Sequence, residues 1–314
     1  MYTYRQIFKQ ALYLALTNPI LWFFGLFAAF LGNAGEMELF TVKYRDSIFL
    51  AVWRGIVDSG LLSPAGLQGF ANSLFTSPLQ FFISLILLFL LVALSVLLLL
   101  VVGVSIVVLI SQSVMISRNQ KMTWRESWSV GIEKFWPVFG LSVGMRIVAG
   151  LLLLILGMVL VLEFKGAIIL YIAVFNLVAV AIAVVSFIGK YAICGVVLKN
   201  WKLGEAVRSA WRLFVENWLL SLEVAASLFV IYSVLGWLIF RIFPDLVLNG
   251  YILFASFPFG LWFIFTLLAL IFLFVQIVLA IFQWAVWSIV FELISSDRKM
   301  LLSRLKNVFQ KTLK

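Results

Sequence analysis

The sequence predicts an all-α integral membrane protein with six transmembrane helices, and three observations lead to this fold class. Of 314 residues, 65% are hydrophobic and 11% are charged, whereas a soluble domain has about 45–50% apolar and about 25% charged residues. The apolar residues form long uncharged runs, such as 79–112, which exceed the ~20 residues that cross a bilayer. Polar stretches with helical periodicity and many tryptophans lie between several of these runs. Together these features exclude a soluble fold.

Six apolar segments are the predicted spans, and each is long enough or nearly long enough to cross a bilayer. They are residues 19–32, 79–112, 138–162, 167–198, 219–240 and 261–293. The first is short, and the apolar residues of the preceding helix, 11–16, could complete it. A cleavable signal peptide is the alternative there, which the 18 preceding residues and Asn18-Pro19 disfavour. Several other spans exceed the bilayer thickness, which predicts tilt or extension into water.

The basic residues predict the orientation of the chain. Of the 23 Lys and Arg residues, sixteen lie in the N-terminal stretch, the second and fourth loops and the tail, and five lie on the other side. Cytoplasmic loops are enriched in Lys and Arg. We therefore expect a multi-pass protein of the bacterial inner membrane with both termini in the cytoplasm.

Four stretches on the cytoplasmic side predict amphipathic helices that lie in the membrane interface. They begin near residues 4, 124, 203 and 301, and each places apolar residues at spacings of three and four. Such helices are too polar to span and place aromatic residues at headgroup level. The alternative is that they pack against the spans. The predicted interfacial anchors are Trp124, Trp128, Trp211 and Trp218.

The order of these segments predicts three parallel repeats. An interfacial helix, a span, an outer loop and a second span occur in 4–112, 123–198 and 203–293. Short matches support this order: 119–122, 200–203 and 297–300 each follow an even-numbered span, and the ends of the amphipathic helices match at 16–19, 132–135 and 215–218. An accidental alternation of hairpins is the alternative.

We expect one membrane domain over 1–314, with an extracytoplasmic loop at 33–78 and a basic amphipathic cytoplasmic tail at 294–314. Loops as long as 33–78 are often functional. The glycines Gly140 and Gly144, four residues apart, fit close packing between helices.

Charged residues inside the spans are the sharpest local feature. Arg146 and Glu223 enter the membrane from the same side, at depths that differ by about 6 Å at 1.5 Å per residue. An unpaired charge in hydrocarbon costs about 2.5–3.5 kcal/mol, so each should find a partner or water. We predict that they form an intramembrane ion pair with a structural role, and the alternative is a polar cavity or ion path. Lys190 and Glu292 are the second predicted pair.

Catalytic, cofactor and metal sites are not predicted. The chain has no histidine and one cysteine, Cys194, which fits a small apolar helix residue. It has no Walker loop, dinucleotide fingerprint, zinc spacing or Ser/His/Asp set. The net charge is +10, and the basic residues cluster beside the ends of the apolar segments. This distribution favours anionic lipid over nucleic acid as the binding partner.

A weak resemblance supports the membrane assignment. The run Asn-Pro-Ile-Leu-Trp-Phe-Phe-Gly-Leu at 18–26 resembles the opening of uncharacterised bacterial multi-pass proteins. These are similar to the membrane domain of some glycerophosphoryl diester phosphodiesterases. The stretch 203–229 looks like a recurring unit of that set. The chain has no room for the phosphodiesterase domain, so neither its activity nor any functional residue carries over.

The sequence thus favours a non-enzymatic membrane protein whose cytoplasmic face contacts anionic lipids, with a role in membrane organisation or in association with a protein partner. The first alternative is a transporter or permease component, which repeats and intramembrane charges favour. The second is a lipid-modifying enzyme. A polar cavity at mid-membrane depth would favour transport, whereas an apolar bundle with a basic face would favour the first reading.

Overall fold

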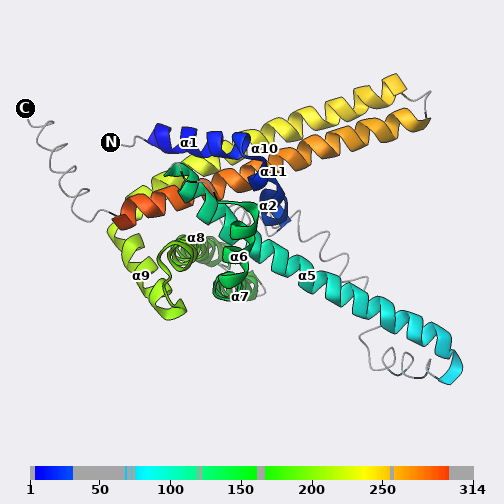
Figure 1. Cartoon of the computed structure of the whole chain (residues 1–314), viewed down its shortest axis with the longest axis horizontal. Coiled ribbons are helices and arrows are strands. Elements are labelled where there is room, and N and C mark those ends of the chain that lie inside the picture. Colours follow the sequence, from blue (N-terminus) through cyan, green and yellow to red (C-terminus); the bar gives the residue numbers. More distant parts are fainter. Residues whose placement is uncertain are drawn as a thin grey trace, which may run out of the picture. The chain divides into compact units, whose positions relative to one another are not determined.

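Helices make up all the regular structure in the described part of the chain (Figure 1). The computed structural model describes residues 4–30, 68, 72, 75–118, 120, 122–160, 167–254 and 258–296. Its helices are α1 (Tyr4–Thr17), α2 (Pro19–Phe30), α5 (Pro78–Ser117), α6 (Trp124–Glu133), α7 (Phe135–Leu160), α8 (Ala167–Lys199), α9 (Leu203–Glu216), α10 (Trp218–Phe254) and α11 (Pro258–Ser296). The predicted all-α fold class is therefore confirmed.

The chain divides into two compact units. The smaller unit is Glu36–Val101, and the larger unit comprises Met1–Gly35 and Val102–Lys314. Helix α5 contributes to both. The predicted loop at 33–78, except for a few residues at its end, and the tail from 297 onwards lie outside the described residues. All contacts that follow belong to the larger unit.

Five helices are long and apolar enough to cross a membrane. These are Pro78–Ser117, Phe135–Met158, Ile169–Lys199, Trp218–Leu238 and Phe265–Ser295, and they coincide with the second to sixth predicted spans. The protein is therefore of the membrane-spanning class. Helix α10 continues to Phe254, so it runs beyond residue 240, where the sequence predicts the fifth span to end.

The first predicted span is not a straight helix. Helices α1 and α2 meet at a bend of 99°, and they count as a sixth span only if the bent pair forms one broken span. Helix α2 has 12 residues, about 18 Å at 1.5 Å per residue, which is short of a ~30 Å hydrocarbon core. The bend has a local cause. Asn18 Nδ2 donates to the Leu14 carbonyl at 3.0 Å, and Pro19 has no N–H with which to continue the helix.

The same one-residue break occurs at two further places. Lys134 separates α6 from α7, and Asn217 separates α9 from α10. Asn217 Nδ2 donates to the Leu213 carbonyl at 3.1 Å, the same bond to the residue four positions earlier that Asn18 makes. Each break therefore joins a short polar helix to an apolar one, which is long after the second and third breaks and has 12 residues after the first.

The core of the larger unit lies where three long helices approach their C-terminal ends. Buried residues concentrate in 102–114 of α5, 187–197 of α8 and 279–294 of α11. Trp287 is fully buried, with ring centroids 5.7 Å from Phe187 and 5.8 Å from Tyr191. Tyr191 and Ser221 share a buried hydrogen bond of 2.7 Å, which links α8 to α10.

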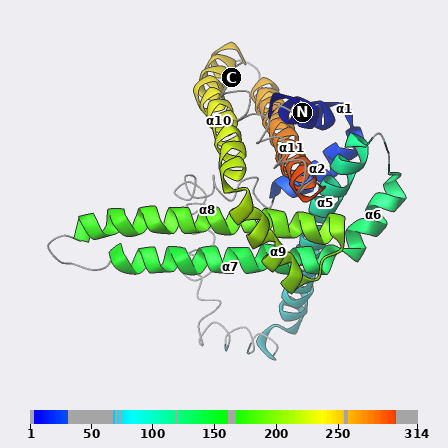
Figure 2. The same cartoon turned by 90° about the vertical axis from the view of Figure 1, so that its left-hand side faces the viewer.

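The long helices leave this core as hairpins. Helices α7 and α8 pack side by side (Figure 2), and α10 packs against α11. Helix α1 packs against α11 as well, with the rings of Phe8 and Phe282 5.9 Å apart. Helix α9 packs against α8.

Glycines permit close approaches between helices in this core, although not at the positions that the sequence suggested. A Cβ on Gly103 would lie 2.5 Å from the Phe135 ring, and a Cβ on Gly131 would lie 2.5 Å from Val104. Nothing among the described residues lies within 4 Å of a Cβ built on Gly140 or Gly144. The expectation of close helix packing at that pair is therefore wrong for the described chain, because neither glycine faces a neighbouring helix.

Candidate functional site

The two charged residues predicted as an intramembrane pair lie on different hairpins. Arg146 is an exposed residue of α7, and Glu223 is an exposed residue of α10. Helix α7 packs against α8, whereas α10 packs against α11. The proposed contact between Arg146 and Glu223 stays a prediction.

The second predicted pair has other neighbours. The Lys190 ammonium is buried and lies 4.7 Å from the centroid of the Trp287 ring, a cation–π geometry. Glu292 accepts a hydrogen bond from Arg118 Nε at 2.7 Å, and a second from the same guanidinium. Arg118 belongs to the basic second loop, which the sequence predicts to be cytoplasmic, and its contact with Glu292 was not predicted. The sequence contains one clue to this contact: Arg118 follows the second predicted span, and Glu292 lies at the end of the sixth predicted span.

The Arg118–Glu292 pair borders a small cavity of about 170 Å³ between α5, α6, α8 and α11, and the other residues of its lining are mostly apolar. The Arg118 side chain is 55% exposed and the Glu292 side chain 23%. Solvent-exposed ion pairs contribute about 0–1 kcal/mol, so the pair orients the helix ends more than it stabilises them. Nearby, Gln112 Nε2 donates to Ser127 Oγ at 2.6 Å and to the Met122 carbonyl at 3.2 Å, which ties α6 to α5.

Helix α6 begins with a complete capping box. The Glu126 carboxylate accepts from the Thr123 N–H at 2.8 Å, and the Thr123 hydroxyl accepts from the Glu126 N–H. These hydrogen bonds hold the pKa of Glu126 below its usual value. The helix is thereby fixed at its first turn, beside the tryptophans that the sequence singled out.

The predicted tryptophan anchors divide into two groups. Trp124 and the half-buried Trp128 lie against α2: the Trp124 ring is 5.0 Å from that of Phe24, and the Trp128 ring is 6.1 Å from it. Trp211 and Trp218 are 53% and 56% exposed. The first group therefore also packs within the protein, and the second presents its rings outward.

Helix α9 has three distinct faces. Ala206 and Ala210 are buried against the rest of the larger unit. A row of apolar residues at spacings of four is exposed beside them, namely Leu203, Val207, Trp211 and Val215. Arg208 and Arg212 are exposed on the next flank. A helix with one flank on protein, one apolar flank outside and one basic flank has the pattern of an interfacial helix.

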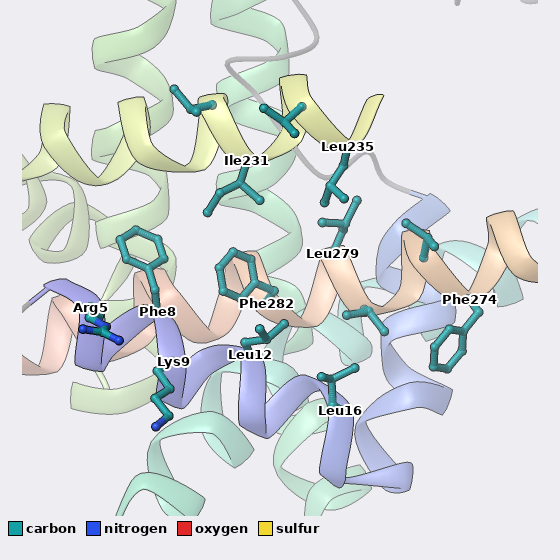
Figure 3. Close-up of a pocket in the computed structure, with 14 residues that line it drawn as sticks. Arg5, Phe8, Lys9, Leu12, Leu16, Ile231, Leu235, Phe274, Leu279 and Phe282 are labelled. Atoms are coloured by element: carbon teal, nitrogen blue, oxygen red, sulfur yellow. The ribbon is translucent and has the colours of Figure 1, made fainter. Parts of the chain in front are cut away.

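A large apolar groove lies between α1, α10 and α11 (Figure 3). Its volume is about 870 Å³. Residues 230–235 of α10 and 274–282 of α11 contribute only apolar side chains to its lining. Helix α1 contributes Arg5, Phe8, Lys9, Leu12 and Leu16.

The packing of α1 explains why its cationic flank lines the groove. Ile7, Ala11, Leu14 and Ala15 are buried, so the flank that carries Phe8, Leu12 and Leu16 remains open beside α10. Arg5 and Lys9 lie on the border of this open flank at the same spacing of four. The helical period places these two cations on the face opposite Ile7 and Ala11, and periodicity alone does not show which flank a neighbouring helix covers.

No family model, curated protein or solved structure matches the chain. The resemblance to the membrane domain of glycerophosphoryl diester phosphodiesterases therefore stays an expectation, and the site is defined by its own geometry. That geometry comprises an exposed apolar row on α9, a small cavity beside the Arg118–Glu292 pair and an apolar groove with two cations.

Proposed function

We propose that this chain is a non-enzymatic protein of the bacterial inner membrane whose cytoplasmic face contacts anionic lipids. Its role would be membrane organisation or association with a protein partner. The observation that carries the proposal is the exposed apolar row of α9 beside Arg208 and Arg212. Indole and aliphatic side chains gain free energy at the headgroup boundary, and each basic residue near anionic lipid adds about 1 kcal/mol.

Three parallel repeats would each contribute one short helix to this cytoplasmic face. The three one-residue breaks at Asn18, Lys134 and Asn217 support the repeat, because each separates a short polar helix from the apolar helix that follows it. The buried C-terminal parts of α5, α8 and α11 also occupy equivalent places in the three copies. In this arrangement α1, α6 and α9 are equivalent helices on the cytoplasmic side.

Probes on two flanks of α9 test the proposed contact. Because the native Cys194 is fully buried, single cysteines at Val207 (V207C) and Arg212 (R212C) can carry a fluorophore in the full chain, reconstituted in phosphatidylglycerol-containing vesicles. We expect spin-labelled lipid to quench the probe at position 207 and aqueous iodide to quench the probe at position 212. Iodide quenching of both probes to the same extent would show that α9 lies in water.

A second measurement tests the preference for anionic lipid. Energy transfer from the protein to dye-labelled phosphatidylglycerol reports its local enrichment. We expect R208Q/R212Q to lower the enrichment and R208K/R212K to preserve it, since Coulomb attraction to the membrane surface depends on charge. Equal enrichment in the neutral and charged variants would contradict a lipid-contacting role for this flank.

A further inference from the structure

The groove between α1, α10 and α11 is amphipathic along its length. Arg5 and Lys9 lie at one end, and Leu16 and Phe274 lie towards the other (Figure 3). The two cations are the charged residues of the lining, which contains no Asp or Glu. An occupant that matches these surfaces has a long apolar body and an anionic end.

The positive end of the groove has no internal counter-charge in the described part of the chain. Neither Arg5 nor Lys9 lies within 4 Å of a described carboxylate. Arg5 lies in the first turn of α1, where the helix dipole adds a partial positive charge. An anion at this end would therefore be attracted by both cations and by the helix dipole, and no described carboxylate would compete with it.

We propose that this groove binds one anionic phospholipid, with its acyl chains against α10 and α11 and its phosphate against Arg5 and Lys9. The site goes beyond the proposed function, because it is a defined pocket on a surface other than α9. Its volume of about 870 Å³ lies in the upper part of the ~300–1,000 Å³ range of ligand pockets. A phosphate accepts charge-assisted hydrogen bonds from both cations.

The C-terminal tail of the chain is the other candidate occupant, and its charge argues against it. Residues 297–314 contain six Lys and Arg residues and one acidic residue, Asp297. Placing this segment beside Arg5 and Lys9 would bring like charges together in a groove of low polarity, where their repulsion is weakly screened. An anionic lipid meets the same end of the groove with attraction.

Native mass spectrometry of the full chain in mild detergent tests the site. The probes are dioleoyl phosphatidylglycerol and dioleoyl phosphatidylcholine at equal concentration. We expect one phosphatidylglycerol to bind, and R5Q/K9Q to weaken its affinity roughly 30-fold, since each basic residue near anionic lipid contributes about a factor of five. R125Q/K199Q removes the same charge from exposed residues outside the groove lining and should leave the affinity within about twofold.

Two further variants separate loss of the site from loss of the fold. R5K/K9R keeps both charges and should retain binding. V234W fills the groove without changing its charge and should abolish binding, whereas V148W, at an exposed position of α7, should not. Retention of phosphatidylglycerol within twofold by R5Q/K9Q or by V234W would overturn the proposal, and so would equal binding of phosphatidylcholine.

A photo-reactive residue in place of Leu12 identifies the occupant. We expect a cross-link to phosphatidylglycerol that inorganic phosphate does not compete away, because the acyl chains supply most of the contact surface. A cross-link to residues 297–314 would show that the tail fills the groove. Loss of the lipid cross-link in phosphate alone would show that the site recognises a free anion. These outcomes are independent of the α9 probes, so the two proposals can fail separately.

Discussion

At the scale of single residues, the end of α8 depends on a glycine. The Trp201 ring lies where a side chain on Gly195 would have to be, with its Cε3 atom 2.0 Å from an ideal Cβ. Asn200 has φ 57, in the left-handed region, and the Trp201 N–H donates to the Gly195 carbonyl at 3.4 Å. The chain thus reverses directly over Gly195 before it enters α9.

We expect G195A to lower the free energy of unfolding by about 1–3 kcal/mol, the usual cost of overpacking a core. The matched control is G204A on α9, where nothing described lies within 4 Å of the added methyl group, and where Ala gains about 0.5–1 kcal/mol of helix stability over Gly. Denaturation of the full chain in detergent measures both. A stabilised G195A would show that Trp201 does not lie over this position.

We expect Arg118 and Glu292 to be weakly coupled in their effects on the free energy of unfolding. In a double-mutant cycle with R118M and E292Q we expect a coupling energy of about 0.5–1 kcal/mol, because Arg118 is largely exposed. The matched cycle of K190M with E292Q should show less. A larger coupling energy for Lys190 and Glu292 than for Arg118 and Glu292 would support the pair predicted from the sequence. A double-mutant cycle on Arg146 and Glu223 tests in the same way whether those two residues are in contact.

At the scale of elements, the sequence predicts what is local to one helix. The second to sixth spans agree with the observed helices because hydropathy and helical period belong to each segment alone. The groove and the Arg118 contact were missed because they depend on which helices become neighbours. Arg5 shows the difference: its place on α1 follows from the period, whereas its place beside α10 follows from the packing of Ile7 and Ala11.

The asparagine breaks give a prediction at this scale. N217A should destabilise the chain by about 1 kcal/mol, because it removes the bond to the Leu213 carbonyl and favours a helix that continues through the break. Asn176 makes the same type of bond, to the Ile172 carbonyl at 2.7 Å, within the continuous helix α8. There, N176A should be neutral or stabilising, since Ala is the better helix former. If N217A and N176A shifted the melting temperature in the same direction, Asn217 would have no special role at the break.

At the scale of the whole molecule, the bend of 99° between α1 and α2 decides the number of crossings. If the pair forms one broken span, there are six crossings and both termini lie on the same side. If it is re-entrant, there are five and the termini lie on opposite sides. The excess of basic residues on the predicted cytoplasmic side favours six.

We therefore expect reporter fusions at residue 1 and after residue 314 to report the cytoplasm, and an insertion within 33–78 to report the opposite side. Alkaline phosphatase and green fluorescent protein, which are active on opposite sides of a bacterial inner membrane, provide the paired readout. An insertion at 33–78 on the same side as residue 1, with residue 314 opposite, would establish a re-entrant pair.

The buried sulfur of Cys194 has a kinetic consequence. It lies in α8, fully enclosed in the core where α5, α8 and α11 come together. A thiol reagent can reach it only when that core opens, so its rate of modification reports the opening equilibrium when closing is fast. The modification rate of Cys194 therefore measures how often this core opens. We expect this rate to rise in G195A, one residue away, and to fall when a ligand that binds only the closed form is added.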